Sequence, residues 1–357
     1  MFLKQFSIPI ILSSLFLISI GILVIYSSSM ELAIQQVIFS VIGLLAFLFI
    51  SHLEIKSIKS FIFPLYVLII LALIFVLFLG IETRGSVRWI PLGIFNIQPS
   101  EFAKPVLILF LAQFWVSHLP IAINILKSFL WSLPFLLLIL EQPDLGSALT
   151  VLAIWFGMLF TAKISFKKIL ILVLVVLFII PSSWSFLHDY QKQRITSFLS
   201  PNADPLGRGY NLIQSTIAVG SGELFGRGLG RGTQSRLQFL PGFRTDFIFA
   251  SIAEELGFLG SVIILSLYLF LFTSCIRIAA LTNDLFNYLI IFGGLSMMIF
   301  QFFVNSGMNL GLLPITGITL PLISYGGSSL IATLITLGMI SSVDKSKRGI
   351  DTEADTG

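Results

Sequence analysis

Apolar runs about as long as a membrane is thick dominate this sequence and limit what it can fold into. A helix crosses a hydrocarbon core of about 30 Å with roughly 20 apolar residues. Backbone polar groups in lipid must be satisfied internally, which favours helices. Of the 357 residues, 56% are hydrophobic and only 11% are charged, a composition outside the range of soluble domains. The runs that fit a spanning helix are 8–27, 33–51, 61–80, 100–117, 124–140, 145–162, 168–185, 247–273, 285–306 and 325–343.

We therefore predict an all-α integral membrane protein with ten transmembrane helices. A single polytopic domain covers residues 1–343, and a short polar tail follows at 344–357. Basic residues in short loops mark the cytoplasmic side of a membrane protein. With a cytoplasmic amino terminus, only Arg84 and Arg88 fall in the short loops of the other side, and the cytoplasmic segments hold Lys4, Lys56, Lys59, Lys127, Lys163, Lys167, Lys168, Arg277, Lys345, Lys347 and Arg348.

This asymmetry places both termini in the cytoplasm. The long segment 186–246, between the seventh and eighth spans, is then extracytoplasmic. It carries several basic residues of its own, but long loops are translocated largely regardless of charge. The polar tail is expected to be a cytoplasmic, disordered end.

The stretch 220–260 is rich in glycine and arginine and lies between two apolar runs. Lipid cannot host such a segment, so it must face water or fill a protein-lined cavity beside the bilayer. Its GRGLGRG run resembles a phosphate-cradling loop only loosely, because the lysine and the serine or threonine of a P-loop are missing. We expect it to supply flexible backbone and arginine donors.

Asp246 stands at the start of the eighth span. Two interpretations fit its position. Thr245 can cap the helix with Asp246 in the first turn, where the helix dipole favours a negative charge. Alternatively, a carboxylate at the water-facing mouth among cationic residues can take a proton from a substrate hydroxyl. Glu254 and Glu255 follow deeper in the helix, where pairing with loop arginines or capping of neighbouring segments is expected.

Other polar side chains interrupt the apolar pattern, and charge inside a span suggests function. Glu101 and Lys104 are three residues apart and can pair on one helical face, fixing helix packing or lining a polar cavity. Arg88 can offer a bidentate fork to a substrate phosphate or merely contact lipid phosphates, and Trp89 can be an interfacial aromatic. Asp144 can cap the sixth span or contribute to a site.

The remaining polar segments offer fewer candidate site residues. None of His52, His118 and His188 has a companion at a metal-ligand spacing, so no zinc site is expected. The uncharged segment 305–329 is dense in Gly, Pro, Ser and Asn, and its backbone must be satisfied internally. We expect it to form a folded, re-entrant-like lid beside the site.

In combination these segments resemble the shape, elongation, division and sporulation (SEDS) family of bacterial membrane proteins. Some of the sequence motifs are closer to those of its rod-shape branch. The matching pieces run in family order across nearly the whole chain. They are RWIPLG, QPSEFAK, QPDLGSAL, GRGLGRGTQS, TDFIFASIAEELGFLG and GLLPITGITLPLISYGGSS.

The resemblance implies a peptidoglycan glycosyltransferase that polymerises lipid II at the outer face of the cytoplasmic membrane during elongation, with a class B penicillin-binding protein as partner and no nucleic acid. It implies that Asp246 is catalytic. No tightly bound cofactor is implied, although Mg or Mn can accompany the substrate pyrophosphate. The implied cavity residues are Arg88, Trp89, Glu101, Lys104, Asp144, Gln191, Arg194 and Gln214.

One departure from the family pattern stands just before Asp246. Where the family usually has Pro-Glu and a histidine, this chain has Pro241, Gly242, Phe243 and Arg244. The aspartate keeps its place, but no role of the missing Glu or His can be carried over.

Two other functions fit a polytopic protein with charged groups. A lipid II flippase should hold its ionisable groups near mid-membrane, whereas here they gather at the predicted exterior mouth. A non-catalytic scaffold for the penicillin-binding protein explains the helices but not the cationic segment. The pattern therefore favours the enzyme.

Overall fold

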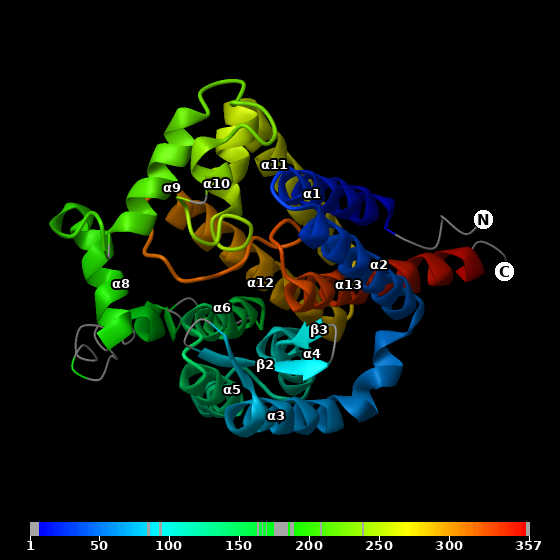
Figure 1. Ribbon diagram of the computed structural model, residues 1–357. Coiled ribbons are helices and arrows are strands. Elements are labelled where there is room, and N and C mark those ends of the chain that lie inside the picture. Colours follow the sequence, from blue (N-terminus) through cyan, green and yellow to red (C-terminus); the bar gives the residue numbers. More distant parts are fainter. Residues whose placement is uncertain are drawn as a thin grey trace.

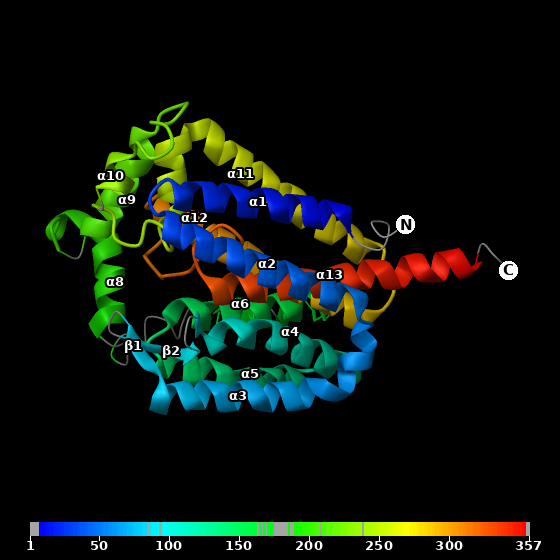
Figure 2. The same ribbon diagram turned by 45° about the vertical axis from the view of Figure 1, so that its right-hand side comes forward.

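The structure is a computed structural model, and it describes residues 7–83, 86–92, 95–162, 164–165, 167–168, 170–174, 185, 189–207, 209–237 and 239–354. Long helices lie roughly side by side, and Figures 1 and 2 show the shorter helices α8, α9 and α10 gathered at one end of this bundle. The start of α1 and the end of α13 lie at the opposite end.

The helices coincide closely with the predicted spans. Nine of the ten predicted runs overlap a described helix, and the run 168–185 falls largely outside the described residues. The long helices are α1 Ile8–Tyr26, α2 Met30–His52, α3 Ile62–Leu79, α4 Pro99–Ser117, α5 Ala122–Glu141, α6 Leu145–Thr161, α11 Ile248–Ala280, α12 Leu285–Asn309 and α13 Gly327–Ala354, and a 3-10 helix at Ile55–Phe61 precedes α3.

By length and apolar composition, seven of the described helices can cross a membrane, namely α1, α2, α3, α5, α11, α12 and α13. Helix α6 is apolar but has only 17 residues. Large apolar side chains such as Phe49 (67% exposed) and Phe78 (81% exposed) cover the outside of α2 and α3. That is the expected surface of a protein whose solvent is lipid. The predicted class, an all-α protein that crosses the membrane several times, is confirmed.

Small residues allow the helices to approach closely, as is common in membrane bundles. Helices α2 and α13 pack along much of their lengths, and a Cβ added at Gly338 would lie only 3.0 Å from the carbonyl oxygen of Phe47. Helices α6 and α12, α3 and α4, and α1 and α11 form the other main pairs.

The segment after α3 is a small sheet, which sequence analysis expected to be a plain loop. Strands β1 Ile81–Thr83, β2 Ser86–Leu92 and β3 Phe95–Ile97 pair antiparallel in that order. Ile81 is opposite Trp89, and Ile90 is opposite Ile97. β-branched and aromatic residues favour such pairing, and the ladder satisfies backbone groups at the edge of the bundle.

Two further segments are more helical than predicted. The long segment 186–246 contains α8 Asp189–Leu199, α9 Tyr210–Ser221 and α10 Thr233–Arg236. The polar tail continues α13 as far as Ala354, so its described part is not a disordered end. Lysine, arginine and glutamate in that tail are good helix formers, which extend a helix once packing has started it.

Helix α11 is broken at Gly257, where φ is 69° and ψ is −164°. Only glycine adopts this conformation readily. The backbone of Gly226 lies against the break, and a Cβ on Gly257 would lie 2.2 Å from the Gly226 nitrogen. The break therefore lets a loop of the long segment 186–246 reach the helix backbone.

Replacing Gly257 by alanine should destabilise the protein by about 1–3 kcal/mol, because it forces a Cβ into a glycine-only conformation. Thermal unfolding in detergent measures the effect. Gly220→Ala in α9 is the matched control, since a Cβ there meets nothing within 4 Å. An unfolding temperature of Gly257→Ala equal to that of the wild type would contradict the described break.

Candidate active site

Asp246 lies in the turn that leads into α11. The helix begins at Ile248 with Phe247 at the N-cap position and no side-chain cap. The prediction that Thr245 caps the helix with Asp246 in its first turn is therefore wrong. The positive φ of Gly242 (72°) folds the chain into a tight turn, so that the Thr245 hydroxyl donates to the Gly242 carbonyl at 3.1 Å instead.

Three successive carbonyls of this turn are held by the segment 305–325. The Arg244 carbonyl accepts from the Tyr325 amide at 2.8 Å, and the Thr245 carbonyl accepts from the Ser324 hydroxyl at 2.7 Å. The Asp246 carbonyl accepts from Asn305 Nδ2 at 2.8 Å and from Asn309 Nδ2 at 3.0 Å. The main chain around the carboxylate is thus fixed from one side along three residues.

Asn305 and Asn309 are one helical turn apart on α12, and both are fully buried. Asn305 Nδ2 also donates to the Ile318 carbonyl at 2.7 Å. Asn309 Oδ1 accepts from the Ala250 amide at 3.0 Å, and its own carbonyl accepts from the Ser215 hydroxyl at 2.8 Å. Sequence analysis missed this pair, although two asparagines four residues apart in a spanning helix are a recognisable signal.

The segment 310–326 packs beside Asp246 as irregular backbone, as the predicted lid would. Gly317 has a φ of 78°, and a Cβ added there would lie 3.7 Å from Asp246 Oδ2. Arg194 of α8 donates from Nη1 to the Thr316 carbonyl at 2.8 Å. The Arg194 guanidinium group and the Asp246 carboxylate therefore lie against adjacent lid residues, Thr316 and Gly317.

The lid is also tied to α2. Gln36 Nε2 donates to the Ser324 carbonyl at 3.1 Å, and the Tyr325 hydroxyl donates to Gln35 Oε1. Burial raises the pKa of Tyr325, and the nearby charge of Glu31 adds to this effect. The hydroxyl thus stays protonated as a donor at physiological pH.

Asp144 is the cap of α6, as one of its two predicted roles required. Its Oδ1 accepts from the Ser147 amide at 3.1 Å, and its Oδ2 accepts from Gln98 Nε2 at 2.9 Å. The start of α6 also lies against the lid, since a Cβ on Gly146 would lie 3.1 Å from the Thr316 carbonyl oxygen. Asp144 therefore belongs to the same end of the bundle as Arg194 and Asp246.

Arg88 points its guanidinium at the turn between α5 and α6. Its Nε donates to the Gln142 carbonyl at 2.9 Å, its Nη2 donates to the Pro143 carbonyl, and its Nη1 lies 3.8 Å from Asp144 Oδ1. These contacts hold the turn that presents Asp144. Trp89, the next residue of β2, is half-buried.

The predicted pair of Glu101 and Lys104 is confirmed. The Lys104 ammonium lies 2.6 Å from Glu101 Oε1 on α4, and both side chains are buried. A buried pair needs good geometry to offset its desolvation. In the same helix Ser100 lies 3.4 Å from Asp144 Oδ2, so the pair lies about one turn below the Asp144 cluster.

The last two predicted cavity residues lie on the short helices α8 and α9. Gln191 is buried on α8, the helix that carries Arg194. Gln214 is half-buried on α9, next to Ser215, which bonds the Asn309 carbonyl. Both helices therefore contribute to the wall around the lid and α12.

Arg244, which stands just before Thr245, bonds a distant part of the chain. Its Nε donates to the Ser28 hydroxyl at 2.7 Å, and its Nη2 donates to the Ser28 carbonyl at 3.1 Å. The guanidinium carbon lies 4.4 Å from the centre of the Phe243 ring. Burial lowers the pKa of this arginine, but an arginine remains charged at any physiological pH. It fastens the Asp246 turn to the connection between α1 and α2.

Glu254 caps a neighbouring segment, which is one of the two roles predicted for this glutamate pair. Glu254 Oε1 accepts from the Gln234 amide at 2.8 Å at the start of α10, and Glu255 accepts from the Ser27 hydroxyl at 3.0 Å. Among the residues that the structure describes, no three His, Cys, Asp or Glu side chains group as metal ligands. The divalent ion associated with substrate phosphates stays a prediction.

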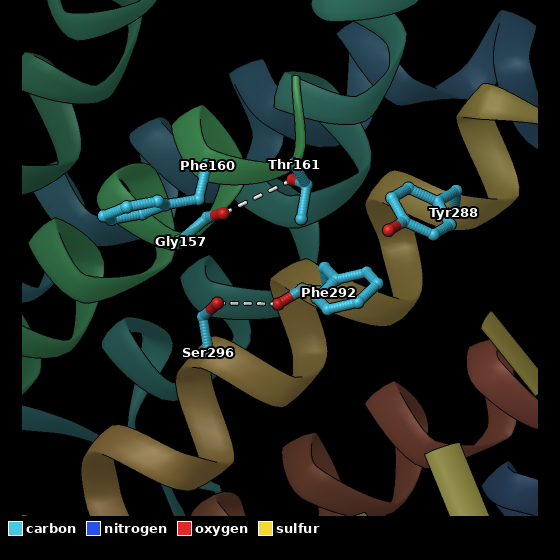
Figure 3. Close-up of a pocket in the computed structure, with 6 residues that line it drawn as sticks. All are labelled: Gly157, Phe160, Thr161, Tyr288, Phe292 and Ser296. Carbon is cyan, nitrogen blue, oxygen red and sulfur yellow. Dashed lines mark hydrogen bonds between the residues drawn. The ribbon is translucent and has the colours of Figure 1, made fainter. Parts of the chain in front are cut away.

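A cavity of about 480 Å³ lies elsewhere, between the last turns of α6 and the first half of α12 (Figure 3). Two of its three hydroxyls bond their own helices, from Thr161 to the Gly157 carbonyl at 3.3 Å and from Ser296 to the Phe292 carbonyl at 2.7 Å. Rings of Phe160, Tyr288 and Phe292 make up most of the remaining wall. The start of α6 and the end of α12 lie near the lid and the Asp246 turn. The cavity lies toward the other ends of these helices and does not form part of the site.

Comparisons with known proteins agree with this geometry. The family model for FtsW/RodA/SpoVE cell cycle proteins matches residues 2–349. The peptidoglycan glycosyltransferase MrdB of Escherichia coli K12 is 40% identical over 333 residues, covering 90% of this chain and 88% of MrdB. The chain therefore belongs to the FtsW/RodA/SpoVE family, the SEDS family of the sequence resemblance.

Two solved structures share the fold. A chain described under structural coordination of polymerization and crosslinking by a peptidoglycan synthase complex superposes with a TM-score of 0.83 at 34% identity, covering 95% of this chain and 97% of that one. The rod shape determining protein RodA of Thermus thermophilus superposes with a TM-score of 0.71 at 30% identity, covering 94% and 96%.

Replacing Asn305 by alanine should lower thermal stability, because the carbonyl of buried Ile318 loses this donor, whereas the Asp246 carbonyl keeps that of Asn309. An unsatisfied buried polar group costs about 1–3 kcal/mol. Thermal unfolding in detergent is the measurement. Ser306→Ala is the matched control, since the buried Ser306 hydroxyl has no hydrogen-bond partner among the residues that the structure describes. If both variants unfold at the same temperature, the described bonds of Asn305 do not contribute.

Proposed function

We propose that this protein is a peptidoglycan glycosyltransferase that polymerises lipid II at the outer face of the bacterial cytoplasmic membrane during cell elongation, with Asp246 as the general base. The observation that carries the proposal is the carboxylate at the lid, whose main chain is bonded at three successive carbonyls. A base fixed in this way is pre-organised, which favours proton transfer in the transition state. The activity of MrdB and the family membership support the same reaction.

The proposed topology has ten spans, with both termini in the cytoplasm. Asp246, Arg194, Asp144 and the sheet would then face the outside. The basic residues of the short loops support this orientation. The gathering of α8, α9 and α10 at the end opposite the start of α1 is consistent with it (Figure 2).

In the proposed reaction, Asp246 accepts the proton of the 4-hydroxyl of the acceptor's N-acetylglucosamine. The hydroxyl oxygen then attacks the anomeric carbon of the donor's lipid-linked N-acetylmuramic acid. The bond to undecaprenyl pyrophosphate breaks, and the diphosphate leaves with the electron pair. Because the donor linkage is α and the product is β, a single inverting displacement suffices. A second carboxylate, usual in glycoside hydrolysis, is not required, since a diphosphate leaves without protonation.

The departing diphosphate needs charge neutralisation. Arg194 is the best-supported donor for this role, because it bonds the lid residue next to Gly317, which lies beside Asp246. Arg88 is less suited than sequence analysis expected, since its fork already holds the Gln142 and Pro143 carbonyls. Lys104, or Mg or Mn bound mainly to the substrate phosphates, could assist.

The proposed partner is a class B penicillin-binding protein. The support is the likeness to a chain of a peptidoglycan synthase complex in which polymerization and crosslinking are coordinated. A flippase and a non-catalytic scaffold remain the rival functions. Against the flippase stands the clustering of Asp144, Arg194 and Asp246 around one lid at the start of α6 and the end of α12, rather than at the middle of the spans.

Asp246→Asn should fold and bind lipid II but extend glycan about 10²–10⁴ times more slowly, the typical contribution of a general base. Labelled lipid II polymerisation by the purified protein with its partner measures the rate. Asp204→Asn is the matched control, because Asp204 is an exposed aspartate of the same extracytoplasmic segment. Polymer from Asp246→Asn at the wild-type rate would refute the assignment of the base.

Detergent micelles have no sidedness, so they separate the rival functions. The proposed enzyme should polymerise lipid II in detergent and should not move the labelled headgroup across sealed vesicles. Headgroup translocation without polymerisation would establish the flippase. Neither activity, with the partner still bound, would establish the scaffold.

A further inference from the structure

The loop between α9 and α10, residues 222–231, is built into the break in α11. The amides of Phe258 and Leu259, which have lost their helical partners at the break, donate to the loop carbonyls of Glu223 at 2.8 Å and Leu224 at 3.1 Å. In return, the amides of Arg227 and Gly228 donate to the carbonyls of Glu254 at 2.9 Å and Glu255 at 3.0 Å. Four backbone bonds therefore hold this loop rigidly against a membrane-spanning helix.

The same contacts give the level of the loop relative to the membrane. Ser27 directly follows α1, a candidate span, and its hydroxyl donates to Glu255. A Cβ on Gly230 would lie 3.3 Å from the Ser27 carbonyl oxygen. The loop is thus level with the end of a spanning helix, where the hydrocarbon core meets the headgroups.

The loop is also at the periphery of the molecule. Figures 1 and 2 both show the connection between α9 and α10 at the edge of the bundle, beyond α1 and α11. Below it on α11 are the outward-facing Phe258 (59% exposed) and Leu259 (48% exposed). These apolar side chains have the surface character of the lipid-facing helices.

The loop presents apolar and cationic side chains together. Phe225 is 78% exposed and Leu224 is 60% exposed. Arg227 and Arg231 are exposed and line a hollow of about 580 Å³ formed by residues 221–227 and 231. Exposed Glu223 offsets one of these two positive charges, so the loop keeps a net positive charge. An aromatic ring beside arginines is the usual composition of a segment at the membrane interface.

We propose that this loop is a binding site for the headgroup of an anionic phospholipid on the side of the membrane that carries Asp246. The guanidinium groups of Arg227 and Arg231 pair with the phosphate, and Phe225 and Leu224 enter the acyl boundary beside Phe258. The occupant is a lipid of the surrounding leaflet, because the loop faces sideways out of the bundle at the level of the headgroups. The substrate diphosphate is a poor fit, because Asp246 precedes Glu255 by nine residues, roughly 13 Å along a helix.

Such a site would anchor the break of α11 in the interface. The helix continues from the break to the Asp246 turn, so the position of the break affects the orientation of the turn. The binding proposal itself does not depend on the catalytic proposal and can be tested without measuring polymerisation.

The test uses site-directed spin labels on the full-length protein in vesicles. Cys275 is the only cysteine of the chain and is buried, so Cys275→Ser with Phe225→Cys gives one labelling site. Leu206→Cys in the same background is the matched control, because Leu206 is 90% exposed on the same extracytoplasmic segment. Collision of the label with oxygen, which concentrates in lipid, is compared with collision with a water-soluble nickel chelate.

In vesicles that contain phosphatidylglycerol, the label at position 225 should shift toward oxygen, while the label at 206 stays accessible to nickel. Replacing Arg227 and Arg231 by glutamine, or the anionic lipid by phosphatidylcholine, should reduce the shift. Lys192→Gln on α8 should leave it unchanged. Equal nickel access at 225 and 206 would overturn the proposal, and so would a shift that ignores both the arginines and the lipid charge.

Discussion

The bonding of three consecutive carbonyls, those of Arg244, Thr245 and Asp246, is the constraint on which the rest of the site depends. The donors come from Asn305 and Asn309 at the end of α12 and from Ser324 and Tyr325 of the lid. A buried carbonyl without a donor is costly, so the turn, the lid and α12 must take up one joint arrangement. That arrangement fixes the position of the Asp246 carboxylate.

The elements around this turn are connected by single residues with more than one contact. Asn305 bonds both Asp246 and Ile318, and thereby joins the turn to the lid. Arg194 joins the lid to α8, and Arg244 joins the turn to the connection between α1 and α2. A membrane bundle obtains little hydrophobic driving force between its helices in lipid. Polar contacts of this kind therefore determine much of the specific packing at the end of the bundle where α8, α9 and α10 lie.

Charged side chains serve two separate purposes at this end of the molecule. Arg88, Asp144 and Glu254 bond backbone groups of turns and helix starts, and Glu255 bonds the Ser27 hydroxyl. In the proposed reaction Arg194 compensates the charge of the departing diphosphate. In the proposed lipid site Arg227 and Arg231, about two turns of α11 from Asp246, bind the headgroup. Within the segment 220–260, Arg244 thus fastens the Asp246 turn, and the proposed lipid site uses Arg227 and Arg231.

The sequence by itself determined the helical class, nearly all of the described spans, the pairing of Glu101 with Lys104 and the cap at Asp144. These features depend on local hydropathy and on residues a turn apart, which are readable along one chain. Only the tertiary structure decided the start of α11 after Asp246, the sheet at 81–97, the use of Arg88 and the clamp of Asn305 and Asn309. The contacts of Arg88 and of Asn305 join groups 54 and 59 residues apart, and local sequence patterns do not specify such partners. The sheet and the turn before α11 depend on backbone conformations that the apolar pattern does not specify.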